Sequence, residues 1–167
     1  MDRLWSPWRS KYIESFNDKK PDREDYCLFC DTLNTPEKDE QKYVLYRGTR
    51  CYVIMNLYPY NSGHLMIVPH RHVSAFTEMT DDEYLEIMQL IRRCCEALTK
   101  TMHPHGFNVG ANIGRVSGAG IEHHIHFHIV PRWSGDTNFM PVLGDTKVIS
   151  EEMSKTYHKI KKHLINP

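Results

Sequence analysis

Three histidines stand at every second position in the run from His124 to His128, which reads His-Ile-His-Phe-His. Side chains alternate between the two faces of a β-strand, so this spacing predicts three imidazoles on one face and Ile125, Phe127 and Ile129 on the other. The apolar face predicts that the strand is anchored in a core. Buried imidazoles need hydrogen-bond partners or a ligand, so the run indicates a functional site. The alternative is the polar face of an ordinary amphipathic strand.

The length and charge of the chain narrow the classes of protein it can belong to. Its 167 residues are enough for one domain with a substantial core, and we expect a single domain over 1–167. The chain has no apolar run of about 18 residues, and its N-terminus lacks the pattern of a signal peptide, so we expect a cytoplasmic protein without a membrane partner. Lysine plus arginine equal aspartate plus glutamate at 21 each, which argues against a nucleic-acid partner.

The cysteines favour thiol or metal chemistry over disulfides. There are five, an odd number, and only Cys27 and Cys30 form a close C-x-x-C pair in a chain without export signals. Cys94 and Cys95 fall within a helical pattern, where we interpret them as packing residues.

The pattern along the chain predicts an α+β fold in which an antiparallel β-meander is combined with one long helix and a C-terminal helix. We expect an irregular segment over 1–42 with a small knuckle at Cys27–Cys30, a core over 43–135, and an extension over 136–167. Short β-rich runs separated by turn residues cover 43–47, 51–56 and 64–69, and a further strand is expected over 107–113.

Two helices are indicated by capping and periodicity. Thr80-Asp-Asp-Glu83 has the form of a capping box, and apolar residues then recur at helical spacing as far as Pro104. Ser150 is a candidate cap for the last helix, whose expected buried stripe consists of Met153, Tyr157, Ile160 and Leu164.

The histidine face suits two kinds of chemistry. A neutral imidazole is a nucleophile near pH 7, and a row of them can combine attack on phosphorus with stabilisation of the phosphate oxygens. The rival interpretation is a metal site in which His124 chelates together with His126 or His128.

These residues carry a resemblance to a known family. His124-Ile-His-Phe-His-Ile-Val130 is similar to the signature of the histidine triad (HIT) superfamily of nucleotide hydrolases and transferases, and Asn56–Pro69 resembles a second motif of that family. The flanks 4–9, 112–121 and 131–139 resemble the fragile-histidine-triad branch and the diadenosine tetraphosphate phosphorylases more closely. Trp5 and Trp8 can equally form a hydrophobic clip for the N-terminus.

The resemblance implies a HIT-like fold and an enzyme that cleaves dinucleoside polyphosphates at the α-phosphate, by hydrolysis or phosphorolysis, through a covalent nucleotidyl-histidine. His126 matches the nucleophile and His128 the residue that bonds the phosphate. Asn56 matches a ribose-binding residue, although it can be a plain turn asparagine. Further candidates for nucleotide binding are His64, Asn112, the backbone at Gly118 and Gly120, and the apolar residues Ile54 and Met66.

One departure leaves open the leaving-group contacts and the choice between water and phosphate as acceptor, because Ala119-Gly120-Ile121 stand where related proteins carry glutamine, serine or threonine. An adenosine phosphoramidase and a non-catalytic nucleotide-binding module are therefore the alternatives.

The resemblance also implies a structural zinc ion and a homodimer. Cys27 and Cys30 match a pair found in many prokaryotic members, and His72 and His124 match the third and fourth ligands. Four protein ligands close a tetrahedral zinc site, so this metal would hold the N-terminal segment and leave the chemistry to His126. The alternative for the cysteines is a pair of small buried thiols.

Overall fold

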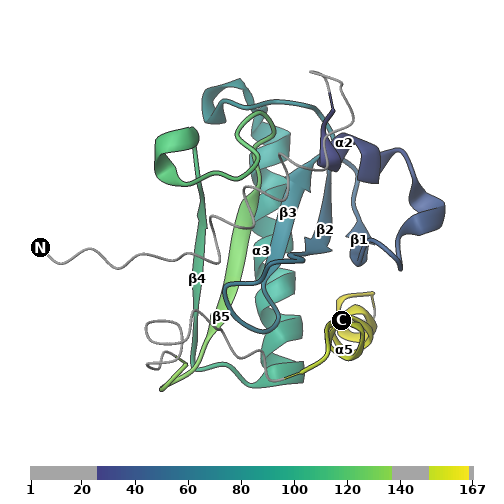
Figure 1. Ribbon diagram of the computed structural model, residues 1–167, viewed down its shortest axis with the longest axis vertical. Helices are drawn as coiled ribbons and strands as arrows, with labels where there is room; N and C mark the ends of the chain where they lie inside the picture. Colours follow the sequence, from purple (N-terminus) through teal and green to yellow (C-terminus); the bar gives the residue numbers. More distant parts are fainter. Residues whose placement is uncertain (1–25, 137–150, 166–167) are drawn as a thin grey trace, which may run out of the picture.

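The computed structural model describes residues 26–136 and 151–165 (Figure 1). The tryptophan-rich N-terminus and the candidate cap Ser150 lie outside this part of the chain. The described residues form a five-stranded antiparallel sheet with helices, in agreement with the α+β prediction. Its strands are β1 (Val44–Arg47), β2 (Cys51–Met55), β3 (Leu65–Pro69), β4 (Gly106–Ala111) and β5 (Phe127–Arg132).

The strand order β1-β2-β3-β5-β4 makes the sheet only partly a meander. The first three strands follow one another as predicted, and their register pairs Val53 with Ile67 across β2 and β3. The chain then leaves the sheet through helix α3 and returns at the edge as β4, so that β5 fills the position between β3 and β4. The histidine-bearing segment therefore enters a central strand.

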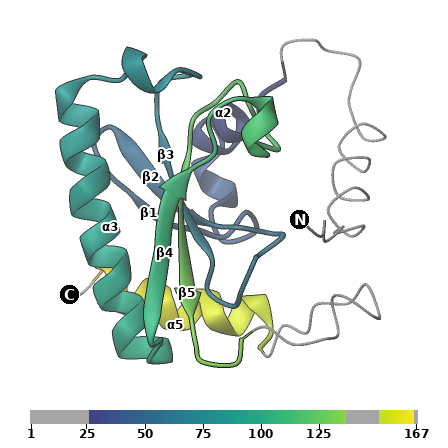
Figure 2. The same ribbon diagram turned by 90° about the vertical axis from the view of Figure 1, so that its left-hand side faces the viewer.

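Alternation of side chains gives the sheet two differently covered faces, and Figure 2 shows α3 on one side and α2 on the other. On the α3 side, Val53, Leu65, Ile67 and Ile129 belong to the main apolar core. On the other side lies a smaller apolar cluster consisting of Cys27, Phe29, Val44, Tyr52, Ile54, Met66 and Val68. The functional candidates face this second side.

Helix α3 (Asp81–Met102) begins and ends as its sequence predicts. The Thr80 hydroxyl accepts from the Glu83 N–H, and the Glu83 carboxylate accepts from the Thr80 N–H, which completes the capping box. The helix ends at His103 in the left-handed conformation, just before Pro104. Cys94 is fully buried among the core residues of this helix, and Cys95 packs against the same core, which confirms the packing interpretation.

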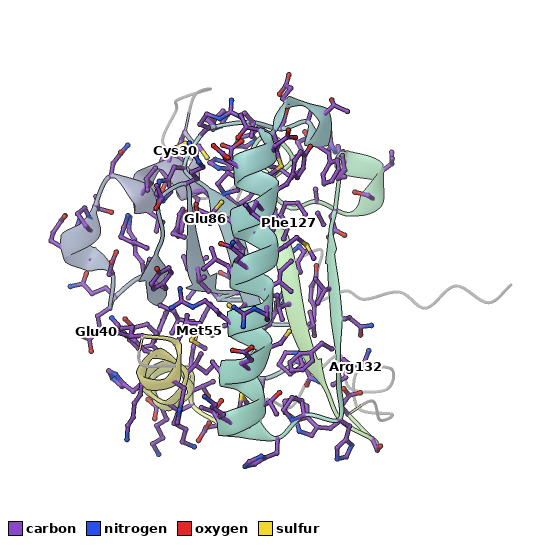
Figure 3. The ribbon with its side chains drawn as sticks, turned by 180° about the vertical axis from the view of Figure 1, so that it is seen from behind. Cys30, Glu40, Met55, Glu86, Phe127 and Arg132 are labelled. Carbon is purple, nitrogen blue, oxygen red and sulfur yellow. The ribbon has the colours of Figure 1, made fainter. Side chains whose placement is uncertain are left out.

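A carboxylate ties α3 to the first hairpin of the sheet. Figure 3 shows Glu86 on the helix-covered side of the molecule. Its two carboxylate oxygens accept from the N–H groups of Thr49 and Arg50 at 2.8 Å each. The turn between β1 and β2 is thereby held against the helix.

The segment before the sheet is more regular than its sequence suggests. Helix α2 (Leu28–Leu33) and the 3-10 helix η1 (Pro36–Lys38) replace the expected loops around the cysteine knuckle. Arg47 on β1 donates to the carbonyl groups of Thr32 and Leu33 at the end of α2. A helix of six residues is too short to produce apolar periodicity, and it depends on this contact with β1.

Helix α5 (Met153–Ile165) packs against α3 and β1. Tyr157, Ile160 and Leu164 are buried, and Met153 is partly buried against the core, as the stripe predicted. The Tyr157 hydroxyl donates to the Val44 carbonyl at 3.0 Å, which fixes the helix to the sheet. No helix within residues 26–136 and 151–165 is long and apolar enough to cross a bilayer.

Candidate active site and metal centre

The ladder of β5 begins only at Phe127, so His124 and His126 precede the strand instead of lying within it as predicted. The reason is that β3 ends at Pro69, which has no N–H to continue the ladder. The chain is extended through loop contacts instead, since the Ile125 N–H donates to the Val73 carbonyl at 2.7 Å. The alternation persists, and all three histidines are buried away from α3.

The ring of His126 is oriented by a neighbouring carbonyl group. Its Nδ1 lies 2.9 Å from the carbonyl oxygen of His124, so Nδ1 carries the proton and donates. Burial lowers the pKa of His126 below its ordinary value, against the opposing effect of that hydrogen bond. A neutral ring protonated on Nδ1 keeps the lone pair of Nε2, which is the atom required for nucleophilic attack.

His128 takes the opposite tautomer through a chain of hydrogen bonds. The Tyr60 N–H donates to Nδ1 of His64 at 3.1 Å, which places the His64 proton on Nε2. That Nε2 lies 2.9 Å from Nδ1 of His128 and donates to it, so the His128 proton is on Nε2. The rings of His126 and His128 are 4.8 Å apart between centroids. His126 thus offers an acceptor nitrogen, and His128 beside it offers a donor N–H.

The glycine that precedes His64 is required by its surroundings. Gly63 has a positive φ of 74°, and a Cβ atom there would lie 2.7 Å from the Met102 sulfur of α3. Only glycine fits both conditions, so the turn that brings His64 behind His128 depends on it.

One cavity brings most of the predicted nucleotide-binding residues together. Its lining includes Ile54, Asn56, Met66, Asn112, Gly118, Gly120, His126 and His128. His64 is absent from the lining, because it is buried behind His128. The Asn56 Oδ1 also accepts from the Tyr58 N–H at 2.9 Å, so Asn56 forms a turn and faces the cavity at once.

The cavity has walls that the sequence reasoning did not single out. Phe29 packs on the His126 ring with centroids 4.9 Å apart. Thr32, Gln41, Lys42 and Tyr60 are among the other lining residues. Phe29 lies between the two cysteines of the C-x-x-C pair, and this position is the sequence feature that could have identified it as a residue of the site. Gln41 and Lys42 lie in a charged stretch that resembled solvated loop.

Two cysteines and two histidines converge beside the histidine row. The sulfur of Cys27 is 3.3 Å from Nδ1 of His124, and the sulfur of Cys30 is 3.6 Å from the same atom and 3.2 Å from Nδ1 of His72. All four ligand atoms lie within 4.8 Å of one another. In a tetrahedral zinc site, typical bond lengths put sulfur and nitrogen about 3.6 Å apart. Across the described residues this is the one such cluster able to hold a metal ion.

The second nitrogen of His124 supports its role as a ligand. Nε2 donates to the Pro69 carbonyl at 3.0 Å, which leaves Nδ1 deprotonated and directed at the sulfurs. Burial lowers the pKa of His124 to about 4, so the ring is neutral. Burial and the neighbouring Cys27 raise the pKa of Cys30 to about 11, so a cation must displace that proton to bind. The donor set therefore fits a zinc ion.

The fold and the histidine row are those of a HIT domain, and the HIT domain family model matches residues 37–135. The chain belongs to this family. An AP-4-A phosphorylase from Mycobacterium tuberculosis is 38% identical over 157 residues, covering 93% of this chain and 80% of that protein. An adenosine 5'-monophosphoramidase from Schizosaccharomyces pombe is 26% identical over 106 residues, covering 64% and 74%. The crystal structure of a Zn-bound histidine triad family protein from Mycobacterium smegmatis shares the fold, with a TM-score of 0.67, 21% identity and coverage of 83% and 93%.

Proposed function

We propose that this protein cleaves dinucleoside polyphosphates at the α-phosphate through a nucleotidyl intermediate on His126. The observation that carries the proposal is the pair of hydrogen bonds that assign opposite tautomers to His126 and His128, two residues that line one cavity. Membership of the HIT family and the similarity to AP-4-A phosphorylase identify the chain as a nucleotide hydrolase or phosphorylase.

The proposed reaction has two displacements. In the first, Nε2 of His126 attacks the α-phosphorus, a P–N bond forms, and the P–O bond to the leaving nucleotide breaks. In the second, water or inorganic phosphate attacks the same phosphorus, the P–N bond breaks, and the imidazole is regenerated. The Nε2–H of His128 donates to a phosphate oxygen in both steps.

The remaining roles follow from position along the cavity. Backbone N–H groups at Gly118 and Gly120, together with Asn112, are proposed to hold the phosphate oxygens. Asn56 is proposed to bind the ribose hydroxyls, and Ile54 and Met66 to form the apolar wall beneath the base. His64 is a positioning residue that sets the tautomer of His128.

We further propose that Cys27, Cys30, His72 and His124 hold a structural zinc ion. The short distances among the four ligand atoms support it, as does the zinc bound to the related Mycobacterium smegmatis protein. The ion would hold α2 and Phe29 against the sheet. With four protein ligands it has no open position for substrate.

The assembly and location of the protein complete the proposal. β4 stands at the edge of the sheet, and its exposed Val109 favours pairing with a second copy in a homodimer. We also expect a single-domain, cytoplasmic protein. Its partner would be a nucleotide substrate, and neither nucleic acid nor a membrane.

The decisive experiment follows the oxygen that enters the product. Diadenosine tetraphosphate is incubated with the protein in ¹⁸O-water, with and without phosphate. Label in AMP indicates hydrolysis, and ADP formed only with phosphate indicates phosphorolysis. His158→Ala, an exposed histidine on α5, is the matched control for His126→Ala. Failure to turn over diadenosine tetraphosphate, with turnover of adenosine phosphoramidate instead, would favour the function of the Schizosaccharomyces pombe relative.

A further inference from the structure

The sheet register shows in which direction a nucleotide would extend from the catalytic histidines. Val44 pairs with Ile54, Ile54 with Met66, and Met66 with His128, so these four residues form one row across four strands. Neighbouring strands are about 4.8 Å apart, which places β1 about 14 Å from His128. A phosphate at His128 and a base over Met66 and Ile54 would direct the outer edge of the base toward the start of β1.

Three polar side chains line the cavity at that end, namely Thr32, Gln41 and Lys42. Thr32 is 1% exposed and offers a single hydroxyl group, which cannot engage two positions of a base edge. The choice of base therefore depends on the other two.

The ammonium group of Lys42 is already engaged. Its Nζ lies 2.7 Å from the Asp31 carboxylate, 2.7 Å from the Thr35 hydroxyl and 3.3 Å from the Asp31 carbonyl. An ammonium group has three donors, and these contacts use all of them. Lysine and arginine are the residues that favour guanine, because O6 and N7 are both acceptors. Holding Lys42 in this way removes that preference.

Gln41 provides both a donor and an acceptor. Its side chain is exposed and lines the cavity, and its amide makes no hydrogen bond to the residues that the structure describes. An amide can pair with an adenine edge, accepting from the N6 amino group and donating to the adjacent ring nitrogen.

We propose that Gln41 is a specificity-determining residue that selects adenine, and that Asp31 and Thr35 support this choice by keeping Lys42 away from the base. The inference rests on the proposed function, since the phosphate is placed at the catalytic histidines. It assigns the choice between adenine and guanine to the segment between α2 and β1.

The test compares kcat/KM for diadenosine and diguanosine tetraphosphate. The wild-type protein should prefer the adenine substrate, and Gln41→Leu should reduce this preference about tenfold through KM, with kcat unchanged. Thr35→Val removes one of the three contacts that hold Lys42 and should raise the relative rate with the guanine substrate. Gln89→Leu, an exposed glutamine on α3, should leave the ratio unchanged.

Equilibrium binding of AMP and GMP to the same proteins separates this inference from the proposed function. If the wild-type protein turns over neither substrate, the proposed catalysis fails, while the AMP-to-GMP binding ratio still tests Gln41. An unchanged ratio in Gln41→Leu, by turnover or by binding, would overturn the assignment.

Discussion

The ion pair between Glu83 and Arg71 makes a testable contribution to stability. Glu83 is a 3% exposed side chain whose two carboxylate oxygens accept from Arg71 at 2.8 and 2.7 Å and, in the capping box, from the Thr80 N–H at 2.8 Å. Arg71 lies next to the metal-ligand candidate His72, so this pair connects the first turn of α3 to the segment that carries the ligand.

The size of the effect follows from the acidity of Glu83. The Arg71 guanidinium, assisted by Thr80 and opposed by burial, lowers the pKa of the Glu83 carboxyl to about 2. An unfolded glutamate titrates near 4.3, and each pKa unit corresponds to about 1.4 kcal/mol, which gives a ceiling of about 3 kcal/mol. Because the Arg71 side chain is 50% exposed, solvent screening reduces this to about 2 kcal/mol.

The sign of the pH dependence is set by the lowered pKa. A carboxylate that is more acidic when folded stabilises the protein fully above its unfolded pKa, and the contribution is lost as the pH falls toward the folded pKa. We therefore expect Glu83→Gln to cost about 2 kcal/mol at pH 7, less than half of that at pH 3, and little at pH 2.

Urea unfolding at these three pH values measures the difference between wild type and variant. Glu96→Gln removes an exposed pair with Arg92 on the same helix and should change the free energy of unfolding by less than about 0.5 kcal/mol. A Glu83→Gln protein as stable as wild type at pH 7, or a gap that is the same at pH 7 and pH 2, would refute the reasoning.

Three further outcomes are expected. His126→Ala should lose several orders of magnitude in turnover while the protein still folds, as thermal denaturation checks, and substantial residual turnover would contradict a nucleophilic role. Cys30→Ser should bind less than one metal ion per chain by elemental analysis and should unfold at a lower temperature, whereas an unchanged metal content would place the ion elsewhere. Gly63→Ala should destabilise the fold by about 1–3 kcal/mol in thermal denaturation, since Cβ meets the Met102 sulfur at a positive φ; a neutral effect would contradict the close approach.

The features predicted correctly from the sequence depend on neighbours in the chain. The capping box at Thr80 and Glu83 and the apolar stripe of α5 involve residues within one or two helical turns, so periodicity reveals them. The alternation around His126 is of the same kind. It placed the histidines on one face even though β5 begins only at Phe127.

The features that were missed depend on contacts between distant segments. Helix α2 depends on Arg47 of β1, and the place of β5 between β3 and β4 depends on how α3 returns the chain to the sheet. Neither the formation of α2 nor the position of β5 in the sheet produces a periodic pattern of apolar residues in its own segment. The walls at Phe29 and Gln41 were missed for the same reason, because a cavity is defined by elements that meet only after folding.

The sequence by itself determined that three imidazoles share one face and that this face is backed by apolar residues, because strand alternation is a local property of the backbone. Only the tertiary structure decided how the three differ. The carbonyl of His124 sets the tautomer of His126, and His64 sets that of His128 from 64 positions away. Cys27 and Cys30 reach His124 from 97 and 94 positions away. Proton positions and ligand sets depend on which groups lie within hydrogen-bond distance, and for such distant residues only the folded chain brings them together.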